Sequence, residues 1–587
     1  MQIYFYLIAL YIFILLGFNI YRSKKVKNQD DFMVAGRQLS LTVMVFTLIC
    51  TWIGSGTFIA GAEYAYEAGW SSLWMPAGAW IGIGIIYFLA GKIRTFGQYT
   101  IGDILEVRYG KFARIFGSIA LIISFTAIVS YQFRAGGLIL NVITSYENNI
   151  SIIKFKDGTT KKVKDLKISY TDSENYGKIL LADNSEISVK NLIISSDGYK
   201  YEDVKDGSQK VLDDKDVISV SKYITYRDII DNTYHSISPN EIKSKEMDAA
   251  ISVFEGELIT AIFVIIFTAI AGMMAVAYTD LPNGIIILLA CIISVPFVIV
   301  KVGGFSEIQQ ILPPGHFAIF PKDFGEFPIL KAIGYFLSTM ILLLGIQSMY
   351  QKFYSAKSPK EAKKAVILWI FGTIIVEVIV VVIAVFGAAY FWNQGKDPAS
   401  IVLLAAKEMV PLPIGILLLA AACAVVISTA MNYLLSPTTN VMRDIYQRFI
   451  NPHASSKKMV TIQKIVVIIF GIIAFVVATQ LVSVLEMSYF AYTIYGVAIT
   501  PALIAALAWK RATKLAGLFS IISGTLVCVI LKISTYILPQ ELVPGGDPLG
   551  IPLIYPSLFI SVISLIIVSY LTPKPNYEEI KQLFPEK

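Results

Sequence analysis

The chain has 587 residues, of which 56% are hydrophobic and only 16% are charged, and its formal net charge is +7. So low a share of charged residues argues against an ordinary soluble enzyme and indicates a protein that lies largely in a membrane. The four cysteines stand far apart in apolar runs, which argues against a disulfide framework or a CxxC metal site, and no phosphate-binding loop indicates an ATP-driven pump. The sequence therefore predicts a polytopic membrane protein that is not an enzyme.

Apolar runs of about 20 residues, the length at which a helix crosses a bilayer, recur along nearly the whole chain. We count thirteen, at residues 3–21, 41–63, 73–93, 115–144, 256–277, 283–302, 329–350, 366–392, 412–436, 461–481, 485–508, 514–538 and 555–573. The predicted fold class is an all-α protein of about 13 transmembrane helices, with the lipid bilayer as its surroundings.

The charges of the short loops predict how these helices are oriented. Arg22 and Lys24 follow the first apolar run instead of preceding it, which indicates a retained helix and not a cleavable signal peptide. Basic loops alternate with loops poor in lysine and arginine; the basic ones are 22–37, 92–114, 352–364, 443–458 and 510–514. Because basic loops stay cytoplasmic, we expect the N-terminus outside and the C-terminus inside the cell membrane, and the net charge is no evidence for nucleic-acid binding.

The second run contains small and polar residues near its centre, between Cys50 and Gly61, including Gly54, Ser55 and Gly56. Each glycine weakens a helix by about 1 kcal/mol relative to alanine. In transporters, interrupted helices use their freed carbonyl groups to bind ions or substrates. A packing face of small residues explains this stretch equally well when it is taken alone.

Between about residues 148 and 250 the chain turns polar, and a pattern beginning at Ile153 recurs 26 residues later at Ile179. Asp157-Gly158 and Asp183-Asn184 are turn signals of β-hairpins, and a weaker third copy centres on Asp206-Gly207. We predict a β-rich extracytoplasmic insert at 148–250, between membrane parts 1–147 and 251–587. A partner-binding role for the insert and a passive one both remain open.

Several motifs occur in the order typical of one family, and they are Phe32 to Arg37, Thr51 to Tyr66 with Gly69, Thr100 to Gly110, Gly272 to Asp280, Gln351 to Lys357, and Asp444 to Tyr446. Together with thirteen runs, they make the chain resemble the sodium:solute symporters, the family of sodium-coupled sugar, proline, pantothenate and choline transporters. The resemblance implies a leucine-transporter-type core of two inverted five-helix repeats, here about 41–302 and 329–508. The helix that opens the second repeat is less clearly interrupted, with Ser338, Thr339 and Gly345 as candidates for its break.

A sodium site follows from the chemistry of oxygen ligands and from the resemblance together. Sodium is a hard cation, and hydroxyl and carbonyl oxygens bind it without burying a carboxylate. Ser428 and Thr429 stand three and four residues after Val425, so they share a helix face with its carbonyl, and the opposing carbonyls would be those of Cys50 and Ile53. These five positions align with sodium ligands of the family's sugar transporters, so Na⁺ is the expected coupling ion. Without the resemblance, hydroxyls bonded back to their own helix would be the preferred explanation.

Two acidic residues near or within the spans have functional interpretations. The resemblance places Asp280 on a sodium exit route, and a solvated charge at a helix end is the alternative. Glu377 lies inside a span, where an ionisable residue indicates function by default, but no role is assigned to it.

The solute pocket is the least determined part of the prediction. The resemblance suggests six lining residues: Trp52, Ser55, Thr57, Thr339, Leu342 and Tyr492. Proline transporters of the family carry an aspartate where Trp52 stands, and Leu342 replaces the gate tyrosine of sugar transporters, so proline and sugars are both disfavoured. The run around Trp52 is more similar to choline transporters, and its indole could bind a quaternary ammonium group by a cation–π contact.

We therefore predict a sodium-coupled symporter for a small organic solute that works by alternating access. A solute sensor that signals through the external insert, and a proton-coupled symporter, are the alternatives left open.

Overall fold

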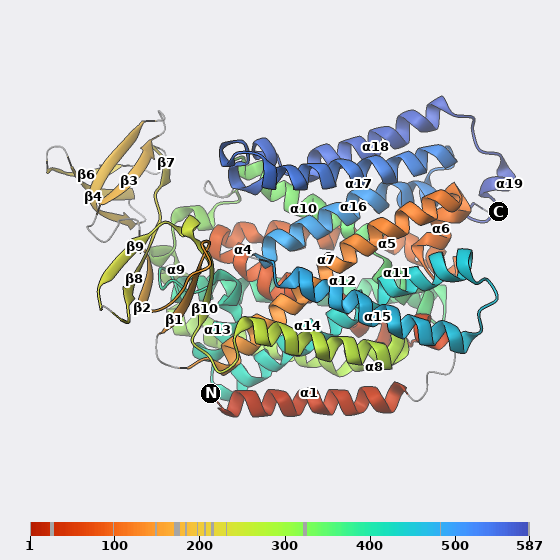
Figure 1. The fold of residues 1–587 in the computed structure, drawn as a ribbon, viewed down its shortest axis with the longest axis horizontal. Helices are drawn as coiled ribbons and strands as arrows, with labels where there is room; N and C mark the ends of the chain where they lie inside the picture. Colours follow the sequence, from red (N-terminus) through yellow and green to blue (C-terminus); the bar gives the residue numbers. More distant parts are fainter. Residues whose placement is uncertain are drawn as a thin grey trace.

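The computed structural model describes residues 2–584 except 24–28, 98, 147–149, 170–175, 182–184, 196–197, 205–206, 213–215, 231, 321–325 and 482. A body of long, roughly parallel helices carries a small β-rich part at one end (Figure 1). The N-terminus lies at the same end of the helical body as the β-rich part, and the C-terminus lies at the opposite end.

The helices before the insert are α1 (Gln2–Ser23), α2 (Gln29–Val34), α3 (Leu41–Trp52), the π-helix η2 (Gly56–Ala60), α4 (Gly61–Ala68), α5 (Trp74–Phe96), α6 (Ile101–Tyr109) and α7 (Lys111–Thr144). After the insert come α8 (Val253–Val302), α9 (Phe305–Ile311), α10 (Pro328–Gly345), α11 (Gln347–Ser355), α12 (Pro359–Tyr390) and α13 (Ile401–Glu408). The last group is α14 (Leu412–Asn440), the π-helix η8 (Val441–Ile450), α15 (Ser456–Ala478), α16 (Val484–Ala508), α17 (Lys514–Ile537), α18 (Ile554–Leu571) and α19 (Tyr577–Ile580).

Twelve helical stretches in the described part of the chain are long and apolar enough to cross a membrane. The difference from the thirteen predicted runs arises in the second one, because α3 has only 12 residues and the helix is interrupted after Trp52. The following stretch, Gly56–Phe96, counts as a single membrane span, although Gly69 with φ +57° separates α4 from α5. The interruption predicted between Cys50 and Gly61 is therefore confirmed, at Ile53 and Gly54.

The boundary predicted between runs 256–277 and 283–302 is wrong. Helix α8 changes direction earlier, at Gly272, whose φ of +61° and ψ of −180° are outside the helical region. A side chain there would meet Phe32, since a Cβ would lie 2.7 Å from its Cδ2 atom. Asp280 consequently lies inside the second half of α8 and not at its end.

The helix that opens the predicted second repeat is also broken. Helix α10 ends at Gly345, Ile346 is extended with φ −73° and ψ 119°, and α11 begins at Gln347. Of the three candidates, Gly345 marks the break, whereas Ser338 and Thr339 lie within regular helix. Each expected repeat thus opens with an interrupted helix.

The insert consists of two five-stranded antiparallel sheets, in the orders β10-β1-β2-β8-β9 and β6-β5-β4-β3-β7. Its strands are β1 (Ser151–Phe155), β2 (Thr160–Ser169), β3 (Tyr176–Leu181), β4 (Glu186–Ser195), β5 (Gly198–Asp203), β6 (Gln209–Leu212), β7 (Val217–Val220), β8 (Tyr223–Asp228), β9 (Tyr234–Ile237) and β10 (Ile242–Met247). The sequence repeat corresponds to the hairpins β1–β2 and β3–β4, and the third copy corresponds to β5–β6. The turn residues Asp183, Asn184 and Asp206 lie outside the described residues.

Helices α14 and α16 form much of the buried centre of the helical body. Helix α14 packs on α3, α7 and α8, and α16 packs on α7 and α10. By contrast, α1, α15, α17 and α18 carry many exposed large apolar side chains, as lipid-facing helices do. The broken helix is therefore placed against both of these buried helices, with α3 on α14 and with η2 and α4 on α16.

Candidate functional site

The break after α3 brings two backbone carbonyls against a hydroxyl of α14. The Thr429 hydroxyl donates to the carbonyl oxygen of Cys50 at 2.8 Å and of Ile53 at 3.0 Å. A Cβ on Gly54 would lie 2.8 Å from the Thr429 Cγ2 atom. The glycine is therefore needed for close packing, and that packing is what positions the oxygens.

Ser428, the neighbour of Thr429, instead faces an acidic group on α8. Its hydroxyl donates to Asp280, which also accepts hydrogen bonds from the Thr47 hydroxyl at 2.5 Å and the Asn432 amide at 3.4 Å. Asp280 is completely buried, so the alternative of a solvated helix-end charge is wrong. Val425 is buried on α14 one turn before Thr429.

A buried lysine, which we did not predict, completes this polar cluster. The Lys352 ammonium group on α11 donates to the side-chain oxygen of Asn432 and to the Met273 sulfur atom, the latter at 3.0 Å. Asn432 thus links Lys352 to Asp280 through its two side-chain ends. The Gln351-Lys352 motif was visible in the sequence, but the burial of Lys352 depends on partners from two other helices, α14 and α8.

A small cavity lies beside the same break and contains four of the six predicted solute contacts. It is lined by Trp52, Gly56, Thr57, Gly61, Ser72, Met75, Pro76, Thr339, Glu377, Val380, Val381 and Tyr492. Its volume of about 30 Å³ admits water but not an organic solute, so the helices around it must separate when a solute binds.

The other two predicted contacts, Ser55 and Leu342, do not line this cavity. The Ser55 backbone N–H donates to the side chain of Gln132 at 3.2 Å, and Leu342 is fully buried in the apolar core. Tyr492 and Trp52 face the cavity together, with ring centroids 6.3 Å apart. A Cβ on Gly56 would overlap the Tyr492 hydroxyl, so the second glycine also permits a close contact.

Glu377 reaches the cavity from α12 and is held by two tryptophans. Its carboxylate oxygens accept hydrogen bonds from the indole N–H of Trp52 at 2.9 Å and of Trp80 at 2.7 Å. A charge within a span marked Glu377 as a functional candidate without a role, whereas its two tryptophan partners could not be read from the sequence.

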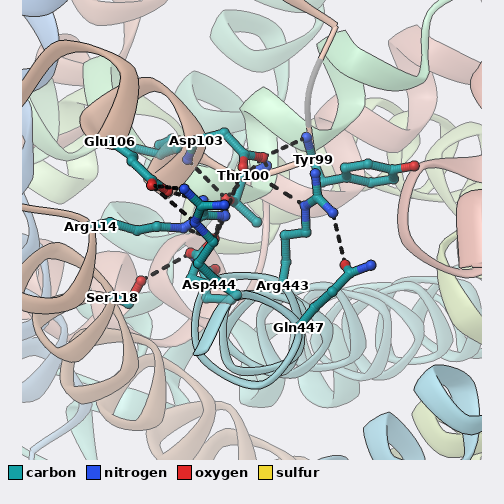
Figure 2. A network of polar contacts seen from close by, with 12 residues as sticks. Tyr99, Thr100, Asp103, Glu106, Arg114, Ser118, Arg443, Asp444 and Gln447 are labelled. Atoms are coloured by element: carbon teal, nitrogen blue, oxygen red, sulfur yellow. Dashed lines mark hydrogen bonds and ion pairs between the residues drawn. The ribbon is translucent and has the colours of Figure 1, made fainter. Parts of the chain in front are cut away.

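At the end of the body opposite the insert, a cluster of charged residues joins α6, α7 and η8 (Figure 2). Arg114 forms ion pairs with Asp103 at 2.7 Å, with Asp444 at 2.5 Å and with Glu106. Burial acts to raise the pKa of Glu106, but hydrogen bonds from Arg114 and Arg448 hold it below its usual range. Two of the sequence motifs, Thr100 to Gly110 and Asp444 to Tyr446, therefore meet in one structure.

Comparison with known proteins agrees with this arrangement. The sequence profile described as "Sodium:solute symporter family" matches residues 32–160 and 246–524, which is more than half of the chain and leaves out most of the insert. The osmoregulated proline transporter OpuE of Bacillus subtilis is 28% identical over 331 residues, 54% of this chain and 64% of that protein. The sodium/proline symporter of Escherichia coli is 25% identical over 297 residues, 48% of this chain and 57% of that protein.

The human high affinity choline transporter 1 is 24% identical over 573 residues, 93% of this chain and 79% of that protein. The two proline transporters are thus matched over less than two thirds of their length.

Two solved transporters share the fold. The substrate-bound, outward-open structure of a Na⁺-coupled sialic acid symporter has a TM-score of 0.66 at 17% identity and covers 98% of this chain and 99% of its own. The nucleobase-cation-symport-1 transporter Mhp1, in a closed conformation, has a TM-score of 0.52 at 11% identity, with 95% and 99% coverage. The fold is accordingly that of the leucine-transporter type, and the protein is an integral membrane protein. With the family profile matched over both halves of the helical body, the chain belongs to the sodium:solute symporter family.

Proposed function

We propose that the protein is a sodium-coupled symporter that moves a small organic solute across the cell membrane by alternating access. The observation that carries the proposal is the approach of the Thr429 hydroxyl to two carbonyls freed by the break in the first core helix. Such a group of buried, uncharged oxygens suits a hard monovalent cation. The names of the relatives, which include sodium/proline symporters, support the same coupling.

In this proposal, Na⁺ is bound by carbonyl oxygens of Cys50, Ile53 and Val425 and by the hydroxyls of Ser428 and Thr429. The Thr429 hydroxyl, which donates to the two carbonyls, rotates so that its lone pairs face the ion. The Ser428 hydroxyl likewise turns away from Asp280. Asp280 then loses one hydrogen-bond donor. We propose that its carboxylate lies on the route by which an ion leaves the site toward the end opposite the insert.

Coupling between ion and solute follows from the position of one residue. Trp52 stands in the chain between the sodium ligands Cys50 and Ile53, and its side chain lines the solute cavity. Fixing the two carbonyls around an ion therefore also fixes the indole. Sodium raises the affinity for the solute, and by linkage the solute raises the affinity for sodium to the same degree.

The proposed orientation has the N-terminus and the insert outside and the C-terminus in the cytoplasm. The basic loop 92–114 supports it, since α6, which lies within that loop, is at the end of the body that carries the C-terminus. The charged cluster of Figure 2 then lies on the cytoplasmic side and joins helices that must part before an ion or solute can leave there.

The relatives named above bear names of proline and choline transporters. Trp52, where proline transporters of the family carry an aspartate, disfavours proline, and Leu342 disfavours sugars. A solute nearer to choline in chemistry is consistent with both residues.

The test is uptake by purified protein in liposomes, with an imposed sodium or proton gradient and with choline, amino acids, sugars and carboxylates as solutes. We expect uptake that requires the sodium gradient and is abolished by the double substitution Ser428→Ala and Thr429→Ala. The matched control is Ser534→Ala with Thr535→Ala on α17, because those adjacent hydroxyls donate to carbonyls of their own helix at 2.7 Å.

Unchanged sodium dependence in the Ser428/Thr429 double variant would contradict the site. Uptake driven by a proton gradient alone would show that the coupling ion is H⁺ and not Na⁺. Binding of a solute without uptake would favour the alternative function, a solute sensor that signals through the external insert.

A further inference from the structure

The carboxylate of Glu377 is the one acidic group among the residues that line the solute cavity, and those residues include no lysine, arginine or histidine. Glu377 is 4% exposed, and no ion pair in the described part of the chain includes it. Its two oxygens are held by N–H donors from different helices, Trp52 on α3 and Trp80 on α5. Neither donor carries a charge.

An ionised carboxylate buried in a membrane protein without a counter-charge is unstable by several kcal/mol. Indole N–H groups offset part of this penalty, and as pure donors they favour the ionised carboxylate, which only accepts hydrogen bonds. A carboxylate has about four acceptor positions, so two remain for another donor. The carboxylate therefore has no charge partner and still has acceptor positions for a further donor.

The aromatic side chains around the carboxylate suit a cation as well. Trp52 and Tyr492 both line the cavity, with ring centroids 6.3 Å apart and planes inclined by 32°. A cation within about 6 Å of an aromatic face is attracted by the ring, most strongly by tryptophan. A cationic group placed between these rings would also lie beside Glu377.

The cavity offers few hydrogen-bond donors to an anionic group of a solute. The backbone N–H of Ser55, at the start of the second half of the broken helix, is already taken by Gln132 at 3.2 Å. The remaining polar side chains of the lining are the hydroxyls of Thr57, Ser72, Thr339 and Tyr492. The cavity thus presents one acidic group and no basic side chain to a bound solute.

We propose that the solute carries a positively charged ammonium group and that Glu377 is its counter-charge, with Trp52 and Tyr492 packed against the cationic end. The inference rests on the proposed function, because it names the class of solute that the same cavity takes. Neutral solutes of equal shape are rejected, since they would leave the carboxylate without a charge partner. Glu377 and Trp52 share a hydrogen bond, so the solute's charge acts on the residue that lies between the sodium ligands.

The test measures binding to the purified full-length protein in sodium buffer, by the shift of its thermal denaturation midpoint with ligand concentration. The probes are methylammonium, tetramethylammonium and choline, with 3,3-dimethylbutan-1-ol as the uncharged isostere of choline. We expect at least one of the cationic probes to bind. If choline binds, we expect its affinity to be at least tenfold higher than that of 3,3-dimethylbutan-1-ol. Glu377→Gln keeps the shape of the side chain and is expected to reduce cation affinity at least tenfold.

Glu377→Asp keeps the charge and is expected to retain the preference for cations at a lower affinity, which separates loss of charge from loss of fold. Glu307→Gln is the matched control, because this glutamate is exposed on the short helix α9 outside the cavity, and it is expected to change nothing. If no cationic probe binds, if the isostere binds as well as choline, or if Glu377→Gln binds cations as the wild type does, the inference is overturned.

Sodium alone, without any probe, supplies the measurement that separates the two proposals. Stabilisation by sodium is expected to persist in Glu377→Gln and to be lost in the Ser428/Thr429 double variant. Sodium stabilisation without a preference for cations would contradict the inference and leave the proposed function intact. A preference for cations with no effect of sodium would contradict the proposed function and leave the inference intact.

Discussion

The two broken helices have the same backbone defect, but their freed groups have different partners. At the break after Gly345, the Tyr495 hydroxyl donates to the Gly345 carbonyl at 2.8 Å and accepts from the Gln347 N–H at 2.8 Å. The Tyr350 hydroxyl donates to the neighbouring Leu344 carbonyl at 2.9 Å. Large, fully buried phenol groups thus close the second break from within the core.

At the first break, the carbonyls of Cys50 and Ile53 share a single threonine hydroxyl on a small side chain. A threonine can turn about one bond without displacing its neighbours, whereas a buried tyrosine cannot. The comparison explains why we propose an ion site at the first break alone, since only its carbonyls are covered by a group that can turn away. The second break is closed by tyrosine hydroxyls, and only the first is proposed to take a cation.

Thr429→Val should show the largest difference between the two breaks. The substitution preserves shape and removes the hydroxyl oxygen, so the half-saturating sodium concentration should rise about 100-fold, equivalent to about 3 kcal/mol. Sodium-dependent uptake or sodium-induced thermal stabilisation measures it. If the half-saturating sodium concentration of the variant stays within threefold of the wild-type value, Thr429 is not a sodium ligand.

Tyr495→Phe tests the other side of the comparison. It leaves the Gly345 carbonyl and the Gln347 N–H without their partner, and a buried unsatisfied group destabilises by about 1–3 kcal/mol. We expect a lower denaturation midpoint in detergent together with an unchanged half-saturating sodium concentration. A large change in sodium affinity with normal stability would show that the second break also takes part in ion binding.

Gly54→Ala sharpens the role of close packing at the first break. The added Cβ would lie 2.8 Å from Thr429 Cγ2 and 2.9 Å from its hydroxyl oxygen, so the threonine must shift. We expect the half-saturating sodium concentration to rise about tenfold, or about 1.4 kcal/mol. The control is Gly84→Ala on α5, where nothing lies within 4 Å of the added atom.

His316 provides a smaller, pH-dependent test that applies to the first broken helix alone. Its ring hydrogen-bonds the Tyr66 carbonyl of α4 at 2.9 Å, and burial lowers its pKa to about 4. Because a histidine in the unfolded chain takes up a proton near pH 6.5 and the folded one does not, stability falls as the pH drops from about 6.5 toward 4. We expect a loss of about 1 kcal/mol between pH 7.5 and pH 6, seen as a lower denaturation midpoint.

His316→Gln keeps a hydrogen-bonding side chain and should flatten this part of the pH profile. An equally steep profile in the variant would assign the pH dependence to other groups.

Hydropathy predicted most of the membrane spans, because length and apolar content are local properties of the chain. Gly54 and Gly56 likewise indicated the first break, and the spacing of Asp157-Gly158 indicated the first hairpin of the insert. The position of the turn in α8 was missed, since the gap between the runs 256–277 and 283–302 suggested a loop there. The chain turns instead at Gly272, where a positive φ and a close approach to Phe32 both demand a glycine. Such an approach depends on tertiary packing.

The site was predictable where one helix supplies the pattern and not where several helices meet. The spacing and the resemblance singled out Ser428 and Thr429, and the structure brings Thr429 to the carbonyls of Cys50 and Ile53, whereas Ser428 faces Asp280. Asp280 was placed near the end of a span because the apolar run 256–277 stops before it, yet three donors from α3 and α14 stabilise it inside the helical body. Trp80 and Glu377 are 297 residues apart in the chain, and no local signal joins them.

The charged cluster at the far end of the body contains equal numbers of opposite charges. Asp103, Glu106 and Asp444 are matched by Arg114, Arg443 and Arg448. Arg114 pairs with all three acids, so moving any one of the three helices away leaves a charged side chain on another helix without its partner. Only water that enters after the helices separate can replace that partner. In the proposed transport cycle, the cluster would therefore resist partial opening, so that α6, α7 and η8 separate together and few half-open states let ions leak.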